Sequence, residues 1–87
     1  MSVLRVKESG LFLFTEPSPH ADSSRDLLSE GEILLSFVFV PEGTHLEGHR
    51  WPSEYDWYLV RTSSWQVGWV AGGSKVREHR SYLERLE

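Results

Sequence analysis

The chain has 87 residues, a net charge of −4 and no cysteine. Its length allows one domain, because independent cores usually take about 50 to 200 residues. The missing cysteines exclude disulfides, cysteine zinc sites and thiol catalysis, and they favour a reducing compartment. The negative charge argues against nucleic-acid binding, which needs a basic surface.

The N-terminal residues 1–10 contain charged side chains and no apolar run. We therefore predict no signal peptide, and no segment elsewhere is apolar enough to predict a membrane span. These features favour a cytoplasmic protein. The initial Met1 favours a complete chain.

Short apolar segments between turn residues predict strands rather than long helices. The first half of the chain gives two such segments, residues 3–6 and 11–15. Pro17 and Pro19 end the second of them, because proline cannot donate to a strand ladder. Residues 20–26 are polar and predict a loop, and residues 29–32 predict a turn around Gly31.

Residues 33–40 give the strongest predicted strand, with residues 37–40 apolar on both faces. A long polar loop follows at 41–56. Residues 57–62 and 65–70 predict a hairpin around a turn at 63–64, and Gly72 and Gly73 predict a break.

The last segment predicts an amphipathic helix over residues 75–87. Its apolar residues are three and four positions apart, and Arg80 and Glu84 have the spacing of an ion pair on a helix. The predicted fold is therefore all-β: a small barrel or sandwich of short antiparallel strands over residues 1–74, with the inserted loop 41–56 and a short C-terminal helix over 75–87.

Four segments in order are similar to those of the bacterial SH3-type domain family. Residues 11–18 read LFLFTEPS, 27–34 read LLSEGEIL, 56–61 read DWYLVR and 66–70 read QVGWV. The resemblance covers residues 3–73 and implies an SH3-like barrel of five or six antiparallel strands that acts as a binding module. The long loop, the helix and the aromatic Phe12 and Phe14 depart from the family pattern, and the eukaryotic signature for proline-rich peptides is absent.

No motif for a catalytic nucleophile or a cofactor is visible, so we expect no enzyme activity and no cofactor. His45 and His49 are four residues apart, which is a metal-binding spacing on a helix. Gly43, Gly48 and Pro52 disfavour a helix there, so we predict loop histidines and no metal site.

Aromatic residues cluster between positions 51 and 69. They build either the core or an exposed groove beside the long loop, since aromatic rings are favoured at interfaces. Adjacent residues of a strand point to opposite sides, so Trp57 and Tyr58 cannot both face the groove. The candidate binding residues are His49, Arg50, Trp51, Glu54, Tyr55, Trp57 and Tyr58.

Phe12 and Phe14 form a second candidate surface. The C-terminal helix is their simplest cover, through Val76, Tyr82 or Leu83, and Leu86. The alternative is a partner chain or a second copy that docks on this face.

The sequence favours a small non-catalytic module that binds another protein or peptide. A basic partner would suit the acidic residues of the long loop, Glu42, Glu47, Glu54 and Asp56. The alternatives are an assembly subunit that dimerises or docks through Phe12 and Phe14, and a binder of peptidoglycan or cell-wall peptides. We expect a monomer or a weak homodimer.

Overall fold

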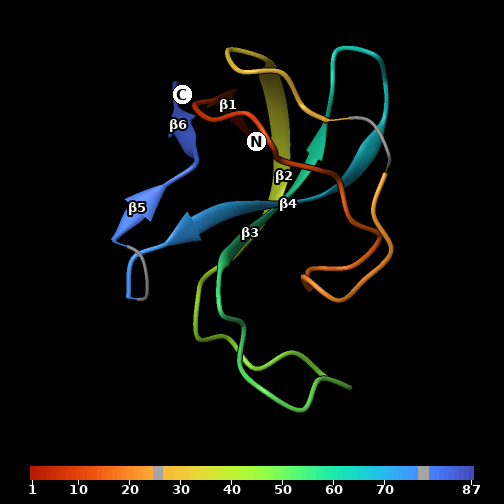
Figure 1. The fold of residues 1–87 in the computed structure, drawn as a ribbon, viewed down its shortest axis with the longest axis vertical. Coiled ribbons are helices and arrows are strands. Elements are labelled where there is room, and N and C mark those ends of the chain that lie inside the picture. The colour runs from red at the N-terminus through yellow and green to blue at the C-terminus, as the bar shows by residue number, and fades with distance from the viewer. Residues whose placement is uncertain (25–26, 77–78) are drawn as a thin grey trace.

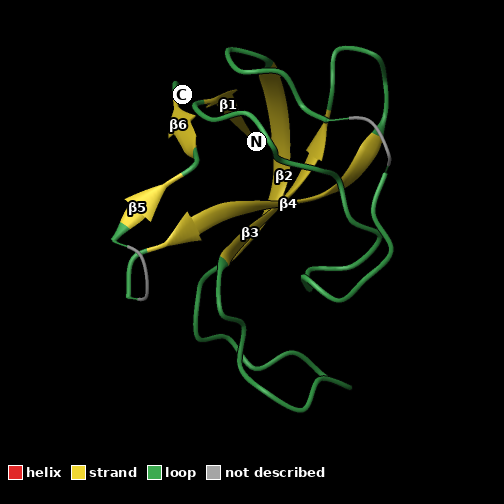
Figure 2. Cartoon of the chain, in the orientation of Figure 1, coloured by secondary structure: helices red, strands yellow, loops and turns green. Residues whose placement is uncertain are grey.

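The computed structural model describes residues 1–24, 27–76 and 79–87. These parts contain strands and loops but no helix (Figures 1 and 2). The prediction of an all-β fold is confirmed. The six strands are β1 (Ser2–Val6), β2 (Ile33–Val40), β3 (Asp56–Arg61), β4 (Val67–Ser74), β5 (Arg80–Ser81) and β6 (Leu83–Arg85).

The strands form one antiparallel sheet in the order β5-β4-β3-β2-β1-β6. The last two strands lie on opposite edges of this sheet, although only Tyr82 separates them in sequence. The Tyr82 amide donates to the carbonyl of Gly72 in β4 at 3.0 Å, and the Lys7 amide beyond β1 donates to the Tyr82 carbonyl at 2.9 Å. This single segment thereby nearly closes the sheet into a barrel, which leaves little unpaired edge.

The predicted C-terminal helix is wrong in the described residues, since residues 80–81 and 83–85 are strands. Arg77 and Glu78 lie outside the described part. Arg80 forms an ion pair with Glu8, while Glu84 forms one with Arg5 across the β1–β6 pair. A lone helix of this length is marginal in water, whereas pairing satisfies the backbone groups of two sheet edges.

The core lies inside the barrel, and five of the six strands contribute apolar side chains to it. Leu34, Val60 and Val70 are fully buried because alternate residues of each strand point inward. The cluster is completed by Leu4, Val6, Leu13, Leu28 and Leu83. A register shift between Ser36 and Val38 makes Phe37 an extra residue of β2. The predicted strand at 33–40 is confirmed, but residues 37–39 are exposed.

Residues 11–24 and 27–28 are loops with isolated bridges, so the predicted strand at 11–15 is wrong. Phe14 exchanges two backbone hydrogen bonds with Trp69 of β4, at 2.7 and 2.8 Å. The close approach depends on Gly68, because a Cβ there would lie 2.9 Å from the Cβ of Leu13. The predicted break at Gly72 and Gly73 is also wrong, since β4 continues to Ser74.

The long loop between β2 and β3 is anchored to the barrel by Glu42, its second residue. The Glu42 carboxylate accepts hydrogen bonds from the Ser74 hydroxyl at 2.6 Å and the Lys75 amide at 2.9 Å. The Glu42 amide donates to Asp56 Oδ1 at 2.7 Å. Figure 1 shows the rest of this loop extending beyond the lower end of the barrel.

Candidate functional site

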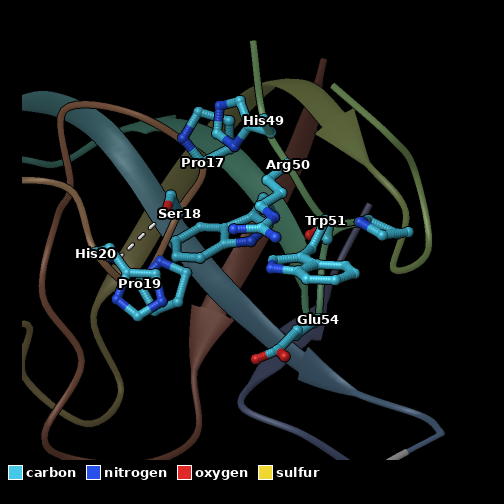
Figure 3. Close-up of a pocket in the computed structure, with 11 residues that line it drawn as sticks. Pro17, Ser18, Pro19, His20, His49, Arg50, Trp51 and Glu54 are labelled. Carbon is cyan, nitrogen blue, oxygen red and sulfur yellow. Dashed lines mark hydrogen bonds between the residues drawn. The ribbon is translucent and has the colours of Figure 1, made fainter. Parts of the chain in front are cut away.

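A pocket of about 220 Å³ lies between two loops that are far apart in sequence. Residues 17–20 form one wall, and residues 49–54 of the long loop form the other. Figure 3 shows Pro17 and Pro19 from the first loop, and Trp51 and Glu54 from the second, around this space. Trp57 at the start of β3 is also part of the lining. The pocket therefore gathers five of the predicted binding residues: His49, Arg50, Trp51, Glu54 and Trp57.

Turns in both loops hold the walls in place. In the first loop, the His20 amide donates to Ser18 Oγ at 3.2 Å, the bond drawn in Figure 3. In the second loop, the His49 amide donates to the carbonyl of Leu46 at 3.1 Å. The proline rings fix the backbone φ angle on both walls, which lowers the entropy cost of presenting a rigid apolar surface.

The two tryptophans of the pocket differ sharply in exposure. Trp51 is 69% exposed, whereas Trp57 is 1% exposed. Trp57 packs edge-on against Phe14 and Tyr55, with ring centroids 5.5 and 6.2 Å apart. Its indole Nε1 is shielded from solvent and has no hydrogen-bond acceptor in the described part of the chain. A buried donor without a partner costs about 1–3 kcal/mol, so this group stands out in the lining.

The pocket carries charges of both signs. The guanidinium of Arg50 lies over the Trp51 ring, 5.2 Å from its centroid, and the Glu54 carboxylate lines the same space. The expectation of a basic partner rested on four carboxylates of the loop. Two of them, Glu42 and Asp56, accept hydrogen bonds that hold the fold. The pocket itself therefore has no acidic excess.

The two loop histidines are not arranged as a metal site. Nε2 of His45 lies 2.6 Å from the backbone oxygen of His49, so the ring bonds to the loop rather than facing the second imidazole. Over residues 1–24, 27–76 and 79–87, no three side chains of the metal-binding types come together.

The structure places the other two predicted residues elsewhere. Tyr55 is half-buried beside Trp57 but lines a different pocket. Tyr58 points to the opposite side of β3 and stacks on Phe39 with ring centroids 4.8 Å apart. Burial raises the pKa of Tyr58, the Asp56 charge raises it further, and the Arg85 charge opposes them. The aromatic residues therefore do not form one continuous groove.

Phe12 and Phe14 are half-buried without a helical cover. Together with Tyr55, Trp57 and Tyr82 they line a small pocket of about 200 Å³. The expectation that the C-terminal helix covers them is wrong, although Tyr82 does reach this pocket from the segment between β5 and β6. Val76 and Leu86 are 74% and 41% exposed.

The wall formed by residues 17–20 was not predicted from the sequence. Pro17 and Pro19 had served only as evidence that a strand ends. Two prolines two positions apart in a loop, in a chain rich in aromatic residues, could have indicated a binding surface. However, nothing in the sequence places that loop against residues 49–54.

Searches of known protein-family models, curated proteins and solved structures found no significant match to this chain. In the residues that the structure describes, no helix has the length and apolar character needed to cross a membrane.

Proposed function

We propose that this chain is a non-catalytic binding module that holds a peptide segment of another protein in the pocket between residues 17–20 and 49–54. The observation that carries the proposal is the buried, unpartnered indole N–H of Trp57 in a pocket walled by prolines and the exposed Trp51. Such a pocket offers rigid apolar contact, with one unused hydrogen-bond donor beneath its lining side chains.

A peptide fits this chemistry better than a charged small molecule. Proline and tryptophan surfaces bind apolar side chains with little loss of side-chain entropy. A backbone carbonyl would supply the acceptor that Trp57 lacks, and its bond would recover the cost of the unpaired donor. Because Nε1 is shielded, the peptide must displace one of the exposed lining side chains to reach it. Arg50 and Glu54 would then orient the chain.

The resemblance to bacterial SH3-type domains agrees with this proposal, since members of that family act as binding modules. The lack of cysteine supports a reducing compartment, and we propose the cytoplasm. Assembly through Phe12 and Phe14 is less favoured, because Phe14 packs against Trp57 of the same chain. No feature of the described residues is specific to a cell-wall ligand.

The test is a selection of peptides from a random display library on the immobilised chain, with Trp51→Ala as the comparison. Trp51 is largely exposed, so its removal should leave the denaturant midpoint unchanged. We expect enriched peptides whose affinity for Trp51→Ala falls about tenfold or more. Failure to enrich any peptide, or enrichment only of peptides that bind both proteins equally, would contradict the proposal.

A further inference from the structure

A second surface lies on the outside of the sheet, away from the pocket. Outward-facing residues of three adjacent strands form it: Val38, Leu59 and Trp69 in one cross-strand row, and Arg61 and Val67 in the next. Trp65, from the turn between β3 and β4, joins them because its ring contacts Arg61. We call these six residues the outer sheet patch. In Figure 1 the β3–β4 turn lies at the upper end of the molecule, opposite the long loop.

The outer sheet patch is apolar where an antiparallel sheet normally faces water with polar residues. Trp65 is 75% exposed, Val67 is 62% exposed and Val38 is 43% exposed, while Leu59 and Trp69 are half-buried. A groove of about 650 Å³ continues from Leu59, Val67 and Trp69. Its far side is formed by residues 13–15 and 23–24. An extended segment of another chain would fit along this path.

Trp65 occupies a backbone position that suits glycine. Its φ angle is 66°, in the left-handed region that costs a side-chain-bearing residue about 1–2 kcal/mol. The Trp65 amide donates to the Thr62 carbonyl, and the Thr62 amide donates to the Gln66 carbonyl. In hairpins with this hydrogen-bond pattern, glycine is the usual residue at the position of Trp65. A large exposed ring at a strained position is therefore not explained by the stability of the turn.

Arg61 is the one charged member of the outer sheet patch, and it has no carboxylate partner in the described part of the chain. Its guanidinium lies 4.0 Å from the centroid of the Trp65 ring, and its Nε is buried with no acceptor. Stacking on the ring holds the guanidinium in a fixed orientation. A carboxylate is the group that best satisfies it, through paired charge-assisted hydrogen bonds.

We propose that the outer sheet patch docks a segment of another protein in which a carboxylate side chain lies next to apolar side chains. The carboxylate binds Arg61, and the apolar side chains cover Trp65 and Val67. A second copy of this chain is a poorer occupant, because a symmetric contact through this face brings two Arg61 guanidinium groups together.

The test is a selection of random displayed peptides on the wild-type chain, after depletion on Trp65→Gly. The expected peptides carry a carboxylate beside apolar residues. Their affinity falls about tenfold or more on Trp65→Gly and on Arg61→Gln, and it weakens as salt is raised. Trp51→Ala leaves it unchanged, which separates this surface from the pocket.

Two controls keep the result interpretable. Trp65→Gly should unfold at the same or a higher denaturant concentration than the wild type, so lost binding would not report lost folding. The proposal is overturned if depletion on Trp65→Gly leaves no enriched peptide, or if the enriched peptides lack acidic residues. It is also overturned if the chain self-associates and Trp65→Gly abolishes that self-association, since the occupant would then be a second copy.

Discussion

At the scale of single residues, two buried donors without acceptors mark the two surfaces. Trp57 Nε1 belongs to the pocket, and Arg61 Nε belongs to the outer sheet patch. Both lie on β3, and alternation along that strand places Trp57 and Arg61 on the same side of the sheet. The two surfaces are separate because Trp57 is the second residue of β3 and Arg61 is its last.

Tyr58 gives a prediction about pH at this scale. Its folded-state pKa is raised above 10.0, mainly by burial and then by the Asp56 charge. Its contribution to stability is therefore complete below about pH 10 and is lost as the pH rises through the folded-state pKa. A tyrosine titration by NMR should give a higher midpoint for Tyr58 in the folded chain than in the urea-unfolded chain.

Two variants check the cause of that shift. The free energy of unfolding of Tyr58→Phe should fall less above pH 10 than that of the wild type, because Phe has no group to ionise. Arg85→Gln should raise the pKa of Tyr58 further, because the guanidinium charge lowers it. A lower pKa in Arg85→Gln would show that the assigned electrostatics are wrong.

At the scale of elements, the sequence predicted the central strands and misassigned the segments around them. The run at 33–40 is rich in β-branched and aromatic residues, and it is a strand as expected. The prediction of a helix over 75–87 was wrong because it used a spacing of three and four. The residues with that spacing are Val76, His79, Leu83 and Leu86, of which only Leu83 is buried. Residues 83–85 form a strand because they pair with β1, where Leu83 lies opposite Val6. Local periodicity in the sequence cannot predict a pairing between such distant residues.

The closing segment gives a prediction that separates strand from helix. As a strand it couples Glu84 to Arg5, with the Arg5 Nη2 atom 2.5 Å from Glu84 Oε2. As a helix it would couple Glu84 to Arg80. Double-mutant cycles with Arg5→Gln, Arg80→Gln and Glu84→Gln should give about 0.2–1 kcal/mol for the first pair, since both side chains are nearly half exposed, and almost nothing for the second. A larger coupling energy for Glu84 with Arg80 than for Glu84 with Arg5 would contradict the strand and support a helix.

At the scale of the whole molecule, the barrel brings together loops that the sequence keeps apart. Five of the predicted site residues meet in the pocket, because they lie within nine positions of one loop and its following strand. The opposite wall at 17–20 could not be predicted, since it depends on how residues 13–14 cross β4 over Gly68. Strand alternation predicted that only one of Trp57 and Tyr58 faces the site, and Trp57 is the one that lines the pocket. Tyr55 was grouped with the site by sequence proximity, and it lines a different pocket.

The central claim is that a peptide bound in the pocket supplies the acceptor missing from Trp57. It is tested most directly by the indole N–H signals of the four tryptophans in a 15N-labelled chain, assigned with single tryptophan variants and followed as a selected peptide is added. Peptides selected by their loss of binding to Trp51→Ala should move the Trp57 signal to lower field and slow its exchange with solvent, with Trp65 unaffected. A Trp57 signal that neither shifts nor slows at saturating peptide would contradict the account.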